Sequence, residues 1–125
     1  MKFSYNADFS HLAPFMPIRL INITTAERQL ELSAQLDTGA DMSAIPQSVV
    51  ADLSLRAKDR ITVADFEKRQ LVVEVYTARI ELPNGRGGMI DVIGAADDYV
   101  LLGRDVLNQL RLLLDGPAQS LEILD

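Results

Sequence analysis

The feature that most constrains this chain is an apolar strand that runs directly into a carboxylate. Residues 30–36 alternate apolar and polar side chains, and Asp37, Thr38 and Gly39 follow without a break. A strand buried in a sheet holds the next residue rigidly, and glycine lets the backbone turn sharply there. We therefore expect the fold to be organised around the position of Asp37.

The rest of the sequence predicts short strands separated by turns. Asn84-Gly85 is a strong hairpin signal, one short helix is expected in the C-terminal half at residues 104–111, and Pro46 could open an earlier one. The expected strands are residues 18–24, 30–36, 61–64, 70–82, 89–93, 99–102, 112–115 and 120–124. This pattern predicts a mainly-β domain, a compact barrel or sandwich.

The chain length of 125 residues fits one domain with one core, covering residues 1–125. Residues 1–17 contain two prolines and are expected to form an irregular N-terminal arm, and residues 115–125 a C-terminal hairpin. The start carries no signal-peptide pattern, and no stretch approaches the ~20 apolar residues of a membrane span. We therefore expect a cytoplasmic protein without a membrane partner.

Charge and composition exclude several function classes. The net charge is −6, which would repel the phosphates of a nucleic acid. The chain has no cysteine and a single histidine, His11, so it offers neither a thiolate zinc site nor a multi-histidine metal site. His11 is expected in the surface arm, and we expect no metal and no cofactor.

The Asp-Thr-Gly tripeptide alone is commonly a turn, but its context is informative. Ala40 continues it with a small residue, and about 60 residues later a second apolar-apolar-Gly element opens the expected late helix. With these two elements the sequence resembles the retropepsins, the single-domain aspartic proteases of retroviruses, and more closely their cellular and prokaryotic relatives. The segments that carry the resemblance are residues 36–41 and 100–107.

The resemblance implies a closed β-barrel protomer that forms a homodimer and cleaves peptide bonds in a peptide or protein substrate without a cofactor. Aspartic protease chemistry uses two carboxylates that share one proton. This chain has one Asp-Thr-Gly, and Asp115-Gly116 before Pro117 is a turn. An active enzyme of this type would therefore combine the Asp37 carboxylates of two chains.

The resemblance also assigns roles by position. Asp37 would be the catalytic carboxylate, Thr38 would brace the two active-site loops across the dimer axis, and Gly39 would permit the tight turn. Asp41 and Arg104 resemble the pair that anchors this loop, although an ordinary surface ion pair remains the alternative.

Ala40 departs from the pepsin-like pattern, in which a serine or threonine at this position donates a hydrogen bond to the catalytic carboxylate. Alanine cannot donate this bond. Because such a donor favours the ionised carboxylate, we expect a pH optimum less acidic than that of pepsin.

The expected substrate-binding residues come from three segments. A hairpin at residues 61–71, the flap, would cover the substrate. The residues expected to line the substrate site are Met42, Val63, Ala64, Asp65, Phe66, Tyr99 and Leu101. The flap contains no glycine and several charges, which leaves a second hypothesis: a dimeric binding or scaffold module that keeps the fold without efficient catalysis.

Overall fold

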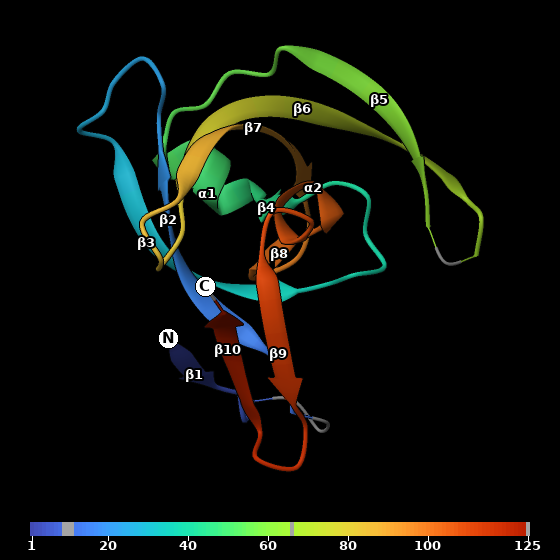
Figure 1. Ribbon diagram of the computed structural model, residues 1–125. Coiled ribbons are helices and arrows are strands. Elements are labelled where there is room, and N and C mark those ends of the chain that lie inside the picture. The colour runs from blue at the N-terminus through green and yellow to red at the C-terminus, as the bar shows by residue number, and fades with distance from the viewer. Residues whose placement is uncertain (9–11, 66, 125) are drawn as a thin grey trace.

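The computed structural model describes residues 1–8, 12–65 and 67–124 (Figure 1). His11 and Phe66 therefore lie outside the described residues. The strands are β1 (Lys2–Ser4), β2 (Phe15–Ile21), β3 (Gln29–Leu36), β4 (Ala44–Pro46), β5 (Asp59–Ala64), β6 (Gln70–Glu81), β7 (Gly87–Ala95), β8 (Val100–Leu102), β9 (Arg111–Asp115) and β10 (Ser120–Leu124). The helices are α1 (Gln47–Asp52) and α2 (Arg104–Leu107).

Six strands close into a barrel, as the sequence predicts. Their order is β2-β3-β8-β4-β7-β6, and β6 pairs back onto β2 to complete the ring. β5 pairs only with β6, and this hairpin arches away from the barrel (Figure 1). Closure satisfies the backbone of the ring without leaving a free edge.

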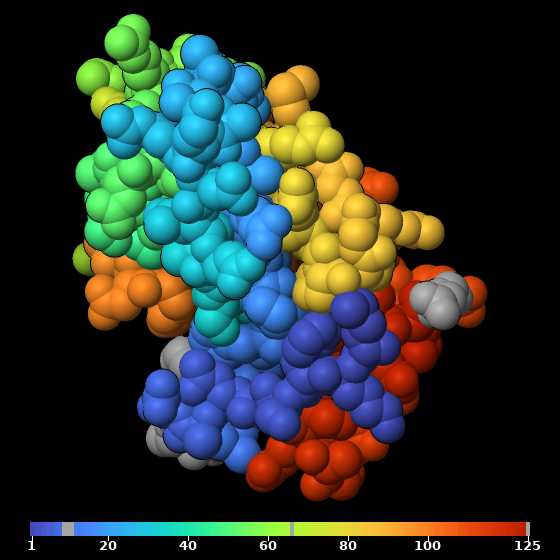
Figure 2. Space-filling model, turned by 90° about the vertical axis from the view of Figure 1, so that its left-hand side faces the viewer, coloured from blue at the N-terminus to red at the C-terminus, as the bar shows by residue number. Residues whose placement is uncertain are grey.

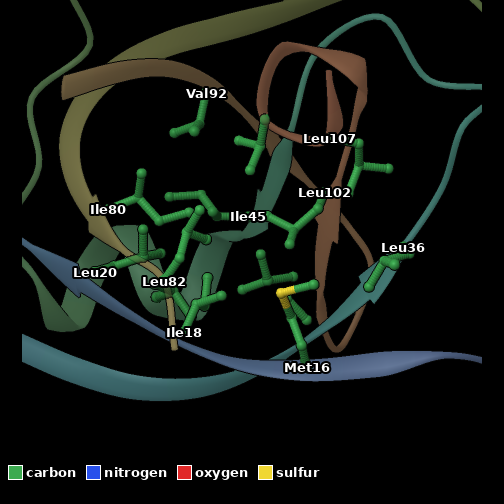
Figure 3. Close-up of a cluster of buried hydrophobic side chains, with 14 of the residues drawn as sticks. Met16, Ile18, Leu20, Leu36, Ile45, Ile80, Leu82, Val92, Leu102 and Leu107 are labelled. Carbon is green, nitrogen blue, oxygen red and sulfur yellow. The ribbon is translucent and has the colours of Figure 1, made fainter. Parts of the chain in front are cut away.

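The barrel is filled by apolar side chains that project from the inner faces of its strands. Met16, Ile45 and Leu102 are fully buried and point toward one another from β2, β4 and β8 (Figure 3). The alternation of β3 places Ala34 and Leu36 on the same inner face. The end of β3, from which Asp37 emerges, is therefore fixed by the core.

A second sheet of three strands combines both ends of the chain. Its order is β1-β10-β9, so the N-terminal strand pairs with the C-terminal strand of the same chain. Figure 2 shows the N-terminal segment, in dark blue, lying against the red C-terminal hairpin. Leu121 and Ile123 of β10 are buried and join the barrel core.

The expectation of an irregular arm at residues 1–17 is wrong in part, because β1 and the first three residues of β2 fall within it. Leu36 donates its N–H to the Pro14 carbonyl, so even-numbered residues of β2 bond to β3 and odd-numbered ones face β6. Pairing with β6 begins only at Arg19. Pro17 thus lacks an N–H at a position where no strand requires one.

Other boundaries differ from the sequence predictions by a few residues. The structure has the early helix, α1, as well as the late one, and the late helix is shorter than expected and ends at Leu107. The strand expected at residues 89–93 begins earlier, at Gly87, and continues to Ala95 as β7. In the part of the chain that is described, no helix has the length and apolar character needed to cross a membrane.

Candidate active site

Asp37 follows the last residue of β3, and the adjacent backbone orients its carboxylate. The Asp37 N–H donates to the Leu102 carbonyl of β8 at 2.9 Å, and its Oδ1 accepts the Gly39 N–H at 2.8 Å. The residue is partly exposed, and within the described residues it makes no ion pair. Such a carboxylate has a fixed orientation and remains accessible, so it can exchange a proton with a bound molecule.

Arg104 ties α2 to the loop that carries Asp37. Its guanidinium donates to the Thr38 carbonyl at 2.7 Å and pairs with the Asp41 carboxylate. Its backbone N–H donates to the Ala40 carbonyl at 2.8 Å. The Asp41 side chain is 84% exposed, so the ion pair alone contributes little, and the bonds to backbone carbonyls carry more of the anchoring.

A buried hydrogen-bond network lies beneath this loop, and sequence reasoning missed it. Ser43 is 1% exposed. Its hydroxyl donates to Asp105 Oδ1 at 2.8 Å and accepts the Gly103 N–H at 3.0 Å, while its own N–H donates to Asp105 Oδ2 at 3.0 Å. The network joins the end of the Asp37 loop to the start of α2, two segments about 60 residues apart in sequence.

Gly103 allows these two segments to touch. A Cβ atom at this position would lie 2.8 Å from the carbonyl carbon and oxygen of Met42 and 2.9 Å from the Ala40 carbonyl oxygen. The φ of Gly103 is −90°, which any residue can adopt. The glycine is therefore required by the close approach of backbone atoms and not by its conformational freedom.

Leu101 lies on the outer face of β8, because Val100 and Leu102 fill the core, and Tyr99 directly precedes this strand. Leu101 is opposite Gln35 of β3, and Gln35 is opposite Phe15 of β2. The Tyr99 ring contacts the Phe15 ring edge-on, with centroids 5.7 Å apart. Phe15 and Gln35 thus join the expected substrate residues on one face that ends at the Asp37 loop.

The flap residues divide between two faces of the β5–β6 hairpin. Val63 is opposite Leu71, and Thr62 is opposite Val72. Strand alternation puts Val72 on the face that continues into the barrel interior, while Val63 lies on the other face. Val72 is 70% exposed and was missed by the sequence analysis, since its place in an unbroken β-branched run gave no sign of its orientation.

The tip of the flap is a turn organised by Asp65. Its Oδ1 accepts the N–H groups of Glu67 and Arg69, and its Oδ2 pairs with Arg69 Nε at 2.9 Å. Lys68 occupies the left-handed region with φ of 60°, the conformation for which glycine is usual. The turn therefore forms without glycine because one carboxylate bonds to its backbone.

At the base of the flap, the carboxyl group of Asp91 has a pKa that its neighbours shift. Lys58 lies 2.8 Å from Asp91 of β7, and the Thr77 hydroxyl of β6 donates to the same carboxylate at 2.8 Å. Lys58, and then Thr77, hold the pKa of Asp91 below its ordinary value. On the inner face, burial and the hydrogen bond to Glu74 raise the pKa of Tyr76.

Two further observations bear on ligands. A hollow of about 650 Å³ borders Tyr99, and its lining includes Phe15 and Leu32. Among residues 1–8, 12–65 and 67–124, no group of three or more acidic or histidine side chains gathers in a way that could hold a metal ion.

Comparison with known families identifies the family of this chain. A family model described as "gag-polyprotein putative aspartyl protease" matches residues 23–109, which is more than half of the chain and contains both Asp37 and Arg104. The chain belongs to this aspartyl protease family. A search with the sequence found no match among curated proteins.

Solved structures share the fold of this family member at low sequence identity. A retropepsin-like aspartic protease from Rickettsia conorii is 16% identical, with a TM-score of 0.67 over 98% of this chain and 88% of that one. The EIAV protease, solved with an inhibitor, is 19% identical, with a TM-score of 0.60 over 86% of this chain and 93% of that one. The foamy viral protease-reverse transcriptase is 17% identical, with a TM-score of 0.58. The match covers 79% of this chain and 12% of that one.

Proposed function

We propose that the chain is a homodimeric aspartic endopeptidase, in which two Asp37 carboxylates, one from each subunit, activate a water molecule. The observation that carries this proposal is the state of Asp37: one oxygen is held by the Gly39 N–H at 2.8 Å and the group forms no ion pair within the described residues. Family membership supports the same chemistry. We retain the cytoplasm as the expected compartment.

The proposed reaction needs both carboxylates because their protonation states must differ. Two carboxylates about 3 Å apart cannot both ionise, so the pair holds one shared proton. The ionised Asp37 takes a proton from water as it attacks the peptide carbonyl, and the protonated Asp37 of the partner subunit donates a proton to the carbonyl oxygen. In the breakdown of the tetrahedral diol the C–N bond breaks: the now protonated Asp37 gives its proton to the leaving amine nitrogen, and the ionised Asp37 of the partner subunit takes a hydroxyl proton from the diol. The products are a carboxylic acid and an amine, and the pair again holds one proton.

The surrounding residues take supporting roles in this proposal. Thr38 is exposed at the start of the loop, where its hydroxyl can bond to the partner loop. An extended peptide would lie between the loops and the flap, with Leu101 and Tyr99 on one side and Ala64 with Val72 above. Hydrogen bonds to the backbone of such a substrate would supply much of the affinity. Its side chains, which alternate in direction, would supply the specificity.

The decisive experiment replaces Asp37 with asparagine. We expect Asp37→Asn to abolish cleavage of a peptide library by the purified protein, because an amide can act neither as the base nor as the acid. Asp52→Asn, an identical change on the exposed end of α1, should leave the rate unchanged. Cleavage that survives Asp37→Asn would show that this carboxylate is not catalytic.

A second candidate function follows from the flap tip, which is held by Asp65 and Arg69 in the described structure. A tip ordered in this way could prevent closure over a substrate and leave a dimeric binding or scaffold module. Such a module would form a stable dimer but neither bind pepstatin-like inhibitors tightly nor cleave a peptide library. Inhibitor binding together with cleavage would exclude it.

A further inference from the structure

A polar hollow of about 650 Å³ lies between the β2–β3 loop, the segment that joins α1 to β5, and β6. Its polar lining includes Thr24, Thr25, Arg28, Ser54, Arg56 and Lys58, and it contains no residue of the Asp37 loop. Figures 1 and 2 both place the β2–β3 loop and the segment after α1 at the end of the molecule opposite the terminal sheet. The hollow is therefore a feature separate from the candidate active site.

The lining of this hollow is cationic in a chain whose net charge is −6. Lys58 lies 2.8 Å from Asp91, so its charge is compensated. Arg28 and Arg56 make no ion pair with any described residue, and none of the described residues that line the hollow is acidic. Two positive charges without a counter-charge favour the binding of an anion.

A buried residue fixes the two loops that form the walls. Asn22 is 8% exposed, and its Oδ1 accepts the N–H groups of Thr24 and Thr25 at 2.8 and 3.0 Å. Its side-chain amide donates to the Leu53 carbonyl at the end of α1 at 2.8 Å. Because Asn22 joins the β2–β3 loop to the end of α1, the walls are held in place before any ligand arrives.

Hydroxyl groups supply further hydrogen-bonding capacity in the hollow. The side chains of Thr24, Thr25 and Ser54 form no hydrogen bond with other described residues. Thr77 of β6 also lines the hollow, and its hydroxyl already donates to Asp91 at 2.8 Å. Three hydroxyl groups beside two arginines can therefore serve a ligand that carries both charge and hydroxyl groups.

A phosphate monoester fits the charge of this lining. Its charge of about −1.5 to −2 at pH 7 matches two uncompensated arginines, and a guanidinium can hold two phosphate oxygens at once. The volume lies within the range of about 300–1,000 Å³ that is usual for small-molecule sites. None of the described lining residues is aromatic, so a nucleotide base would find no ring on which to stack.

We propose that this hollow binds a phosphorylated small molecule of the sugar phosphate class. Arg28 and Arg56 hold the phosphate from two different loops, and the free hydroxyl groups bond to those of the sugar. Lys58 precedes β5 and donates its N–H to the Val75 carbonyl at 2.8 Å, so an occupied site joins the β2–β3 loop to the base of the flap. The proposal goes beyond the aspartic protease function, and its test measures binding alone.

Binding can be followed by NMR titration of ¹⁵N-labelled protein in a phosphate-free buffer, with the ionic strength fixed by sodium chloride. The titrants are inorganic phosphate, glucose 6-phosphate and glucose. We expect saturable changes at the amides of residues 22–28, 54–58 and 77, with tighter binding of glucose 6-phosphate than of inorganic phosphate. Glucose should cause no change at the same concentrations, because it lacks the charge.

Three variants test which residues bind the phosphate. Arg28→Gln and Arg56→Gln should each weaken the binding of glucose 6-phosphate at least about tenfold, because each removes charge-assisted hydrogen bonds. Both arginines are exposed, so the variants should keep the fold. Lys2→Gln removes the same charge from β1 at the other end of the molecule, and screening should keep its effect within about twofold.

The other outcomes overturn the proposal. A loss for Lys2→Gln as large as for the arginine variants would mean diffuse attraction of anions, and shifts that do not saturate would mean that no site exists. Equal affinities for inorganic phosphate and glucose 6-phosphate would exclude the sugar phosphate class. Tighter binding of a phosphoserine peptide than of glucose 6-phosphate would show that the ligand is a phosphorylated protein segment instead.

Discussion

At the scale of single residues, backbone groups do most of the positioning at the candidate site. The Leu102 carbonyl and the Gly39 N–H fix Asp37, and two of the bonds that hold the loop to Arg104 end on carbonyl oxygens. The substitution that tests the chemistry most directly is therefore one that adds a donor next to the carboxylate.

Ala40 is the position for that donor. Ala40→Thr should move the acidic limb of the pH–rate profile to lower pH by about 0.5–1 unit, because a hydroxyl bonded to the ionised carboxylate favours the charged form. Ala40→Val has nearly the same shape without the donor and should leave the limb in place. Equal shifts for both variants, measured as kcat/KM against pH, would mean that packing and not hydrogen bonding is responsible.

The natural protein sets the reference for this comparison. With alanine at position 40, its own optimum should lie in the mildly acidic to neutral range. A profile that peaks below about pH 3, where both protons of a carboxylate pair are bound, would contradict the reasoning.

Gly103 provides a second prediction at this scale. Gly103→Ala should lower the free energy of unfolding by about 2 kcal/mol or more, since the added carbon meets backbone atoms of Met42 and Ala40 that cannot turn aside. Gly88→Ala is the matched control, because a Cβ there has no heavy atom within 4 Å. Its effect in urea denaturation should stay within about 0.5 kcal/mol. Similar losses for both variants would refute the steric account.

The sequence identifies Asp37, Arg104 and Gly103 because each stands in a recognisable motif. It does not identify Ser43 or Asp105 as partners, although both lie within or beside those motifs. Their hydrogen bonds form only because two loops lie side by side in the fold. The spacing of these residues along the chain does not predict that contact. Phe15 was missed for a different reason, because prolines on both sides made its segment resemble an irregular arm.

At the scale of elements, the flap is a long hairpin anchored by its base. Asp91 of β7 forms an ion pair with Lys58 at the start of the hairpin and accepts a hydrogen bond from the Thr77 hydroxyl of β6. This carboxylate therefore links three segments where the flap leaves the barrel. Its charge should affect both stability and the amplitude of flap motion.

The pH dependence of this link has a definite sign. A carboxyl group whose pKa is lower in the folded state stabilises the fold above its unfolded pKa of about 3.9, and that contribution is lost as the pH falls through the folded pKa. Asp91→Asn should therefore lower the melting temperature at pH 7, and the difference should shrink as the pH falls below the unfolded pKa. Because the side chain is 46% exposed, the loss should stay below about 1 kcal/mol.

The control for Asp91 is Asp97→Asn, which removes an exposed carboxylate from the loop before β8. Thermal melts of both variants and of the natural protein at pH 7, 5 and 3 are the measurement. A difference for Asp91→Asn that persists unchanged at the lowest pH would assign the effect to packing and not to charge.

Element prediction succeeded where periodicity was long and failed where a tertiary contact decides. The strands expected at residues 30–36 and 70–82 agree with β3 and β6 to within one residue at each end, since the first alternates over its whole length and the second is long and rich in β-branched residues. Lys68 shows the limit. Its left-handed backbone is supported by the Asp65 bonds, so the absence of glycine from the flap did not prevent a tight turn.

At the scale of the whole molecule, both ends of one chain complete one small sheet. β1 covers one edge of β10 and β9 covers the other, so this sheet is formed within a single protomer. Completing this sheet therefore requires no strand from a partner. Association would then add a site to a structure that is already stable, and activity would follow the concentration of dimer.

Mixing experiments test whether the site is shared between two chains. If each site needs two Asp37 residues, a threefold excess of Asp37→Asn protein should lower the activity of a fixed amount of natural protein to about a quarter, because only that share of natural chains finds a natural partner. A site contained in one chain predicts no loss. The measurement is the peptidase rate after subunits have exchanged to equilibrium.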